Sequence, residues 1–323
     1  MHARNSKNAF YSRIFAAAAF LAAASAYAQP YGYVSSMMGN TVSVLNRATN
    51  KVVTNITISA AGLAGLAVSP SGANVWVAEE SKNSIGVINT TSYAVTHTIP
   101  VGSSPVQIAF TPNGNTAYVA NQNSNNVSAI NTDSKSVVAT VPVGNKPVAI
   151  AATLDNSRVL VSNLTSNNIS VINTSTNKVE ATWPALSGPS GMAMSPNGEL
   201  VYVSNQYANS VSVYNLASGV RESTITGFFA PTSLAVTPDG TKLYVANTNS
   251  ASVAEVNTST LSITAKIPVG TLPCSVAVSS DGSTVYVTNA LSYTLSEINT
   301  STNAVKVTVA SIGIYPFSAA LYH

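Results

Sequence analysis

Few side chains in this sequence could take part in acid–base or metal chemistry. The histidines and cysteine are scattered and form no pair at ligand spacing: His2, His97, His323 and Cys274. Two groups of carboxylates have suggestive spacing. Glu79 and Glu80 are neighbours, and Glu255 and Glu297 lie 42 residues apart. Two glutamates in equivalent places could act as acid and base if burial raised one pKa.

We interpret these residues mainly as structural. Glu255 and Glu297 are expected to be rim carboxylates paired with a nearby Lys or Thr, because buried acidic side chains are rare and usually paired. The alternative is a dry site between adjacent repeats. Glu79 and Glu80 are expected to be a solvated pair, because a cation site needs several converging oxygens. Cys274 is expected to pack as a small apolar residue rather than act as a reactive thiol.

A repeat of about 42 residues positions these groups. One marker is a Tyr-Val pair or its substitute, with a first spacing of 43 and five further spacings of 42; it begins at Tyr33, Trp76, Tyr118, Leu160, Tyr202, Tyr244 and Tyr286. The second is a proline, replaced by Leu63 in one copy; it stands at Pro105, Pro147, Pro189, Pro231, Pro273 and Pro316. Seven copies of each marker indicate a repeat architecture.

Each period contains four β-rich runs, here named strands A to D. In one copy they are residues 105–111, 115–121, 126–132 and 136–143. A Gly turn such as Asn113-Gly114 joins A to B and supplies the positive φ of a tight hairpin. The copy around Asp155 lacks this Gly, and we expect it to turn differently. An Asn, usually followed by Thr or Ser, recurs between C and D, where such side chains cap turns.

Four antiparallel strands repeated seven times predict an all-β fold, a seven-bladed β-propeller of four-stranded blades. A β-solenoid is the alternative, but its coils are shorter. After residue 28 the chain starts with a B strand and ends with an A strand, residues 316–322. We expect that last strand to complete the first blade and close the ring, so deleting residues 316–323 should destabilise the whole molecule.

The N-terminus reads as a secretory signal peptide. Residues 1–28 combine a basic start, the apolar run 15–24 and an Ala-Tyr-Ala site, so we expect cleavage and a single propeller domain over residues 29–323. The mature chain should be periplasmic or extracellular, with no transmembrane segment. Its Lys plus Arg and its Asp plus Glu are then equal, at 11 each, because the signal holds three of the 14 cations and no anion. This balance disfavours nucleic-acid binding.

The markers resemble those of the YVTN-repeat β-propellers, which include surface-layer propellers and YncE-like periplasmic proteins. The residues that carry the resemblance are Tyr286–Asn289 (YVTN), its variants YVAN and YVSN, and the segments of the form PxxxAxxPxG. It covers residues 31–323 and implies seven blades with strand A nearest the axis. It implies little about activity, because a fold does not determine function.

The predicted axial channel lacks reactive side chains. None of the seven A strands contains Asp, Glu, His, Lys or Arg, and Ala recurs in each of them. Acid–base catalysis and metal binding need titratable or donor groups that converge on a pocket, so we expect neither metal nor cofactor. An enzyme would need a cluster built from Glu79, Glu255, Glu297 or His97.

The D–A and B–C loops should emerge together on one face, and they vary more than the turns opposite. They carry aromatic residues that we select as candidate binding residues: Tyr207, Phe228, Phe229, Tyr293 and Tyr315. The alternative is that these rings only cap loop ends. We therefore predict an exported non-catalytic scaffold for a protein or glycan partner. The alternatives are a lactonase-like or redox-associated propeller enzyme, or a surface-coat module.

Overall fold

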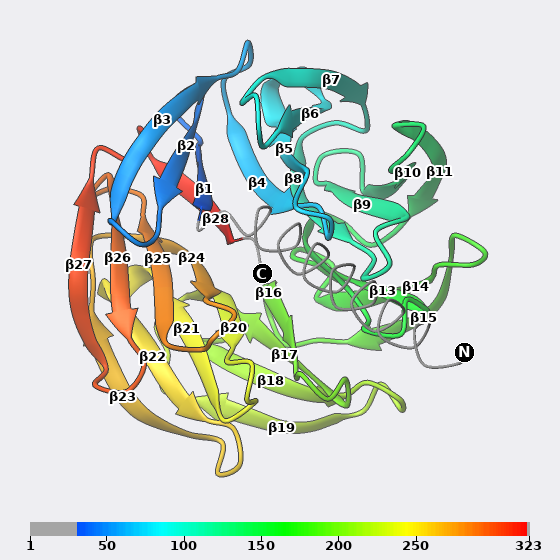
Figure 1. Ribbon diagram of the computed structural model, residues 1–323. Helices are drawn as coiled ribbons and strands as arrows, with labels where there is room; N and C mark the ends of the chain where they lie inside the picture. Colours follow the sequence, from blue (N-terminus) through cyan, green and yellow to red (C-terminus); the bar gives the residue numbers. More distant parts are fainter. Residues whose placement is uncertain (1–30, 322–323) are drawn as a thin grey trace, which may run out of the picture.

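The computed structural model describes residues 31–321, which form seven four-stranded antiparallel sheets around one axis (Figure 1). This confirms the predicted seven-bladed propeller. The predicted signal peptide, with His2 in it, lies outside the described residues, as does His323. The two helices of the described part are the single 3-10 turns η1 (Glu80–Lys82) and η2 (Thr248–Ser250), and no helix there is long and apolar enough to cross a membrane.

The A strands of neighbouring blades contact one another round the axis. They are β28 (Pro316–Leu321), β4 (Leu63–Val68), β8 (Pro105–Phe110), β12 (Pro147–Ala152), β16 (Pro189–Met194), β20 (Pro231–Val236) and β24 (Pro273–Val278), from blade 1 to blade 7. In the same order the B strands are β1 (Tyr31–Ser36), β5 (Asn74–Glu79), β9 (Thr116–Asn121), β13 (Arg158–Asn163), β17 (Leu200–Asn205), β21 (Lys242–Asn247) and β25 (Thr284–Asn289).

The outer half of each blade consists of strands C and D. The C strands are β2 (Thr41–Asn46), β6 (Ser84–Asn89), β10 (Asn126–Asn131), β14 (Asn168–Asn173), β18 (Ser210–Asn215), β22 (Ser252–Asn257) and β26 (Thr294–Asn299). The D strands are β3 (Lys51–Thr57), β7 (Val95–Pro100), β11 (Ser136–Pro142), β15 (Lys178–Pro184), β19 (Arg221–Thr226), β23 (Ser262–Pro268) and β27 (Ala304–Ala310).

The C-terminal strand closes the ring. β28 pairs antiparallel with β1, with Tyr33 opposite Ala320 and Val34 opposite Ala319, so blade 1 is built from both ends of the described chain. Figure 1 shows the red β28 beside the blue β1. The predicted closure is therefore confirmed. Blade 1 has four strands like the other blades, so the inner edge of β1 is not left open where the ends of the described chain meet.

The hydrophobic core lies between blades rather than in one centre. Strands B and C are buried on both faces, whereas the D strands alternate between exposed and covered residues. One core cluster joins Tyr202 and Val211 of blade 5 to Leu243 and Val245 of blade 6. Within each blade the recurrent Ala of strand A stands opposite the large residue that begins the strand B marker, as Ala109 does with Tyr118. A small and a large side chain fill the space together.

The A–B turns share one geometry, including the copy that lacks Gly. Gly114, with φ 74°, donates its N–H to Thr111 O at 2.8 Å. In blade 4, Asn156 takes the same place with φ 62° and donates to Thr153 O at 3.0 Å. The expectation of a different turn around Asp155 was wrong, because Asn tolerates the left-handed conformation better than other residues with a Cβ.

Hydroxyl groups of four B strands tie neighbouring blades together at the axis. Ser204 accepts the N–H of Gly191 in its own blade (2.7 Å) and donates to Thr232 O of the next blade (2.5 Å). Thr288, the Thr of the YVTN motif, accepts from Ser275 N (3.1 Å) and donates to Phe317 O (3.2 Å) in the same way. The other two bridges are made by Ser35 and Ser162. We call these four groups the hydroxyl bridges.

Candidate functional site

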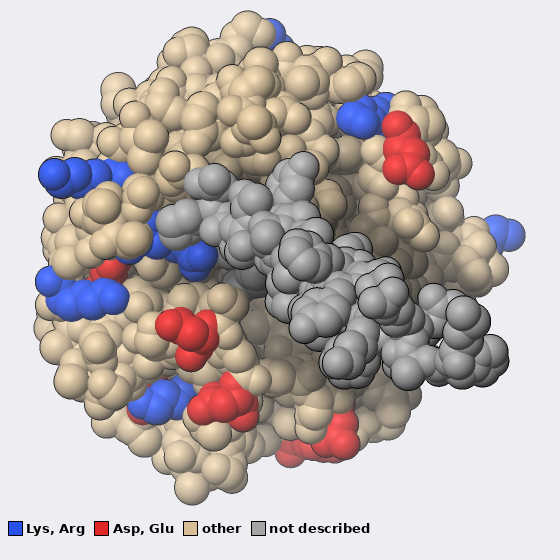
Figure 2. Space-filling model, viewed as in Figure 1, with Lys and Arg blue, Asp and Glu red and all other residues tan. Residues whose placement is uncertain are grey.

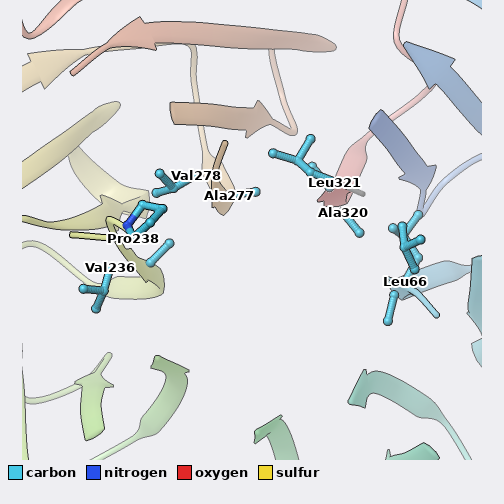
Figure 3. A pocket seen from close by; sticks show the side chains of 11 residues that line it. Leu66, Val236, Pro238, Ala277, Val278, Ala320 and Leu321 are labelled. Carbon is cyan, nitrogen blue, oxygen red and sulfur yellow. The ribbon is translucent and has the colours of Figure 1, made fainter. Parts of the chain in front are cut away.

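The axial channel contains a cavity of about 340 Å³ at the end where the A–B turns lie. Figure 3 shows its lining residues around an open centre. All of them are Ala, Val, Leu or Pro: Leu66, Ala67, Val68, Ala235, Val236, Pro238, Ala277, Val278, Ala319, Ala320 and Leu321. Among the described residues, the lining side chains are therefore all hydrocarbon and none could transfer a proton, and the polar part of the wall is backbone. Within residues 31–321, no three His, Cys, Asp or Glu side chains gather as a metal site would need.

Glu255 is paired as expected, but it is buried rather than at the rim. It is 5% exposed and receives hydrogen bonds from Lys242 Nζ (3.2 Å), Tyr244 Oη (3.1 Å) and Thr264 Oγ1 (2.7 Å). Burial acts to raise its pKa, but the bonds from Thr264 and Lys242 outweigh it and hold the pKa below the ordinary value. Lys242 also donates to Thr300 O of blade 7 (2.6 Å), so the group joins two blades.

Glu297 is fully buried, so the expectation of a rim carboxylate was wrong here too. Its Oε2 lies 3.8 Å from Lys306 Nζ. With the Asn50 amide turned so that its nitrogen faces the carboxylate, Nδ2 lies 2.8 Å from Oε1 and 3.2 Å from Oε2. Burial raises the pKa of Glu297, and Lys306 opposes this rise. Both glutamates are thus held by side chains between blades, away from the cavity.

Glu79 contradicts the expectation of a solvated pair. It is 1% exposed, and its Oε2 accepts a 2.6 Å hydrogen bond from Ser84 Oγ. Space for it comes from the next strand, because a Cβ on Gly86 would lie 2.6 Å from Glu79 Oε1. Four other blades hold Asn and Ser at the positions of Glu79 and Gly86, as in the bond from Asn121 Nδ2 to Ser128 Oγ (2.9 Å). Glu79 therefore replaces a structural amide.

Cys274 and His97 lie apart from these carboxylates. Cys274 Sγ is 3.4 Å from Leu272 O, and burial raises the pKa of the thiol to about 11. A thiol with so high a pKa is a poor nucleophile. His97 is exposed on the outer strand β7, where its Nδ1 lies 3.1 Å from Thr96 Oγ1.

The D–A and B–C loops form one face of the ring, which we call the loop face. Of its five candidate residues, Tyr207 is 60% exposed, Phe229 58% and Tyr293 47%. These are the exposed aromatic side chains of residues 31–321, and they lie in blades 5, 6 and 7. Tyr315 is half-buried. Phe228 is in the core between blades 5 and 6, at 3% exposure, so its proposed surface contact is wrong.

Tyr293 occupies a backbone position where other blades use Asn for structure. The last residue of the B–C loop has positive φ in six blades, including Tyr293 at 57°. In blades 2 to 5 it is Asn, whose side chain accepts the N–H that precedes the next A strand, as Asn209 does from Ala230 (2.8 Å) and Asn125 from Lys146 (2.9 Å). Tyr has no such acceptor and is an unfavourable residue at positive φ. Local stability does not explain its presence.

Further exposed apolar residues on the loop face are Met38 at 70%, Leu291 at 51% and Ile314 at 58%. The candidates selected from the sequence were all aromatic and left out these three, including Leu291 and Ile314. The signal was available, because both stand in the same variable loops as Tyr293 and Tyr315. The six exposed apolar residues together span blades 5 to 1, and we call them the apolar patch: Met38, Tyr207, Phe229, Leu291, Tyr293 and Ile314.

Charge is distributed differently on the two faces. Within the loop face, the charged residues of the described chain are Glu80, Lys82 and Lys146, all in the loops between blades 2 and 4. Figure 2 shows the opposite face, where acidic and basic side chains are spread over the surface. The loops that carry the apolar patch contain no Asp, Glu, Lys or Arg.

Comparisons with known proteins agree on the fold. The family described as "Lactonase, 7-bladed beta-propeller" matches residues 28–141 and 155–266. A search of curated protein sequences found no match. Hydrazine synthase from Kuenenia stuttgartiensis has a similar structure, with TM-score 0.78 and 19% identity over 85% of this chain and 93% of that one. A functionally unknown protein from Desulfotomaculum acetoxidans DSM 771 has TM-score 0.80 and 17% identity over 91% and 99%. At these identities the likeness extends to the fold alone.

Proposed function

The chain belongs to the Lactonase, 7-bladed beta-propeller family, and from this premise we propose that it is a non-catalytic scaffold that binds a protein or glycan partner through its loop face. The observation that carries the proposal is the location of the exposed aromatic side chains. In residues 31–321 all three belong to the loop face of adjacent blades. Exposed rings on rigidly held loops are a common basis of recognition.

The contacts around these rings support a preformed surface. Tyr207 packs against Gly188, where a Cβ would lie 2.6 Å from the ring. Phe229 N donates to Asn247 Oδ1 at 3.1 Å, and Leu291 N donates to Thr271 O at 3.2 Å. Loops that are already fixed lose little conformational entropy on binding.

Within the family, we propose a place among the YVTN-repeat propellers, supported by the YVTN motif at Tyr286–Asn289 and its variants. We also propose export, supported by the composition of residues 1–28. N-terminal sequencing of the protein from the cells that produce it tests this second point. A mature chain that begins at Gln29 supports export, and a chain that retains residues 1–28 contradicts it.

A photo-crosslinking experiment tests the binding surface. Benzoylphenylalanine replaces Phe229 on the loop face or, as the matched control, Val220 on the opposite face; each residue is 58% exposed. After irradiation of the producing cells, adducts should form from position 229 at about ten times the yield from position 220, as expected for a specific contact. Equal yields, or no adduct at position 229, contradict a partner at the loop face.

A lactonase-like hydrolase is the second candidate, favoured by the family description alone. Its acid–base groups would have to come from Glu79, Glu255, Glu297 or His97, and none of these lines the axial cavity. A pH-stat assay with glucono-δ-lactone distinguishes the candidates. If the protein is a scaffold, the lactone should hydrolyse no faster than in buffer alone. Turnover that falls at least about tenfold in Glu255→Gln or Glu297→Gln would establish the enzyme instead.

A further inference from the structure

The loop face has the chemistry of a surface for uncharged ligands. From Ala185 through Tyr315, and again in residues 37–40, its loops contain no Asp, Glu, Lys or Arg. Lys266 of the outer strand β23 contacts one of these loops, but its ammonium donates to Gly227 O at 2.9 Å. Anionic partners are recognised by free Arg and Lys side chains, so this surface favours a neutral one.

Polar groups without charge surround the exposed rings. Asn249 and Ser250 follow β21 in blade 6, next to the loop of Phe229, and both are exposed. Thr271 is exposed in blade 7, where its N–H donates a hydrogen bond to Ser292 Oγ at 2.7 Å, in the same pair of loops as Tyr293. Hydroxyl and amide groups both donate and accept hydrogen bonds, which suits a ligand rich in hydroxyls.

Aromatic rings and neutral amides together match a carbohydrate. A sugar ring has a face of C–H groups and an edge of hydroxyls. Its C–H face can lie on the electron-rich face of an aromatic ring, while its hydroxyls bond to amides and hydroxyls beside that ring. Rings in three adjacent blades would contact several sugars of one chain.

We propose that the loop face binds a neutral oligosaccharide or polysaccharide chain, whose sugars stack on Tyr207, Phe229 and Tyr293. This inference rests on the proposed function and specifies the chemical class of its partner. It explains why Tyr stands at position 293, where blades 2 to 5 have Asn at the same positive φ. It also explains why the apolar patch lacks charge.

The test is binding of the purified chain, residues 29–323, to an array that contains neutral and acidic glycans. The wild-type protein should bind at least one neutral glycan. The Tyr207→Ser/Phe229→Ser variant should lose affinity for it by at least about tenfold, the size of effect expected for a ring at a binding hot spot. The control Val220→Ser, which changes an equally exposed apolar residue on the opposite face, should bind as the wild type does.

Three results would overturn the inference: no neutral glycan bound, only acidic glycans bound, or equal binding by the double variant. Circular dichroism and thermal melting of each variant separate lost binding from lost folding. The crosslinking experiment separates this inference from the proposed function. Protein adducts at position 229 without glycan binding would leave the loop face as a protein-binding surface and reject the carbohydrate.

Discussion

Single residues can be judged against the six other copies of the same position. Glu297 occupies a place that is Val in four blades, and its carboxylate is buried between blades with Lys306 at 3.8 Å. Its lack of contact with the cavity argues against a catalytic role. Tyr293 shows the reverse, because it is exposed and replaces an Asn that stabilises other blades. A residue that breaks a structural rule on an exposed loop is better evidence for binding.

Replacing Glu297 by Val should leave the free energy of unfolding unchanged or raise it by about 1–2 kcal/mol, as for other buried ion pairs replaced by apolar groups. Val already fits the position in four blades, and the Lys306 side chain is 40% exposed and can turn to water. Urea denaturation measures the change. A loss of more than about 1 kcal/mol would show that the pair stabilises the fold.

The pH dependence of stability should reflect the A–B turns. Hydrogen bonds from Thr153 and Ser157 lower the pKa of Asp155 to about 2, and those from Ser279 and Ser283 do the same for Asp281. Because the folded pKa lies below the ordinary value of 3.8, the stabilisation is present above that pH and is lost as the pH falls toward 2.

The Asp155→Asn/Asp281→Asn variant checks this assignment. Asn113 and Asn197 fill the same position in other blades and accept the same hydrogen bonds, so the variant should fold. Denaturation between pH 4 and pH 2 should show a smaller loss of stability than in the wild type. An identical loss in both proteins would assign the acid sensitivity to other groups.

At the scale of strands and turns, the hydroxyl bridges are the main links that sequence reasoning did not find. Their residues are Ser or Thr in four blades and Ala in the other three, so the repeat alone hides their role. Each hydroxyl uses an N–H of its own blade and a carbonyl of the next. These bonds hold the A strands in register around the axis and keep the loops above them in place.

Changing Thr288 to Ala should lower the free energy of unfolding by about 1–3 kcal/mol, because a partly buried carbonyl and a partly buried N–H each lose a partner. Thr288→Ser keeps the hydroxyl and is the matched control. Chemical denaturation of the two variants gives the comparison. Similar stabilities for Ala and Ser at this position would mean that the bridge contributes nothing measurable.

The sequence predicted the strands well because period, turn residues and alternation repeat seven times. The sequence predicted the burial of a side chain less well where that burial depends on a second substitution on a neighbouring strand. Glu79 is buried because Gly86 on the next strand leaves room for it, and that compensation needs the strand register. Phe228 and Phe229 are adjacent in one loop, yet one side chain enters the core and the other faces solvent. Composition cannot tell which of the two side chains is buried, because this depends on the path of the loop backbone.

For the whole molecule, closure by β28 is the feature on which the other blades depend. Deleting residues 316–323 removes the partner of β1 and opens the contact with β4 and β24. We expect the truncated chain to lose cooperative unfolding or to melt well below the full chain, since an unclosed ring exposes sheet edges and the apolar faces of two blades. Differential scanning calorimetry decides, and an unchanged melting temperature would contradict closure by this strand.

We propose that the loop face serves binding at some cost to local stability, and the Tyr293→Asn variant tests both parts of this proposal. In a protein that carries benzoylphenylalanine at position 229, the crosslinking yield and the urea midpoint are measured with Tyr or Asn at position 293. Asn should raise the free energy of unfolding by about 1 kcal/mol, because it tolerates positive φ, while the yield of adducts should fall. An unchanged yield together with unchanged or lower stability would contradict the proposal.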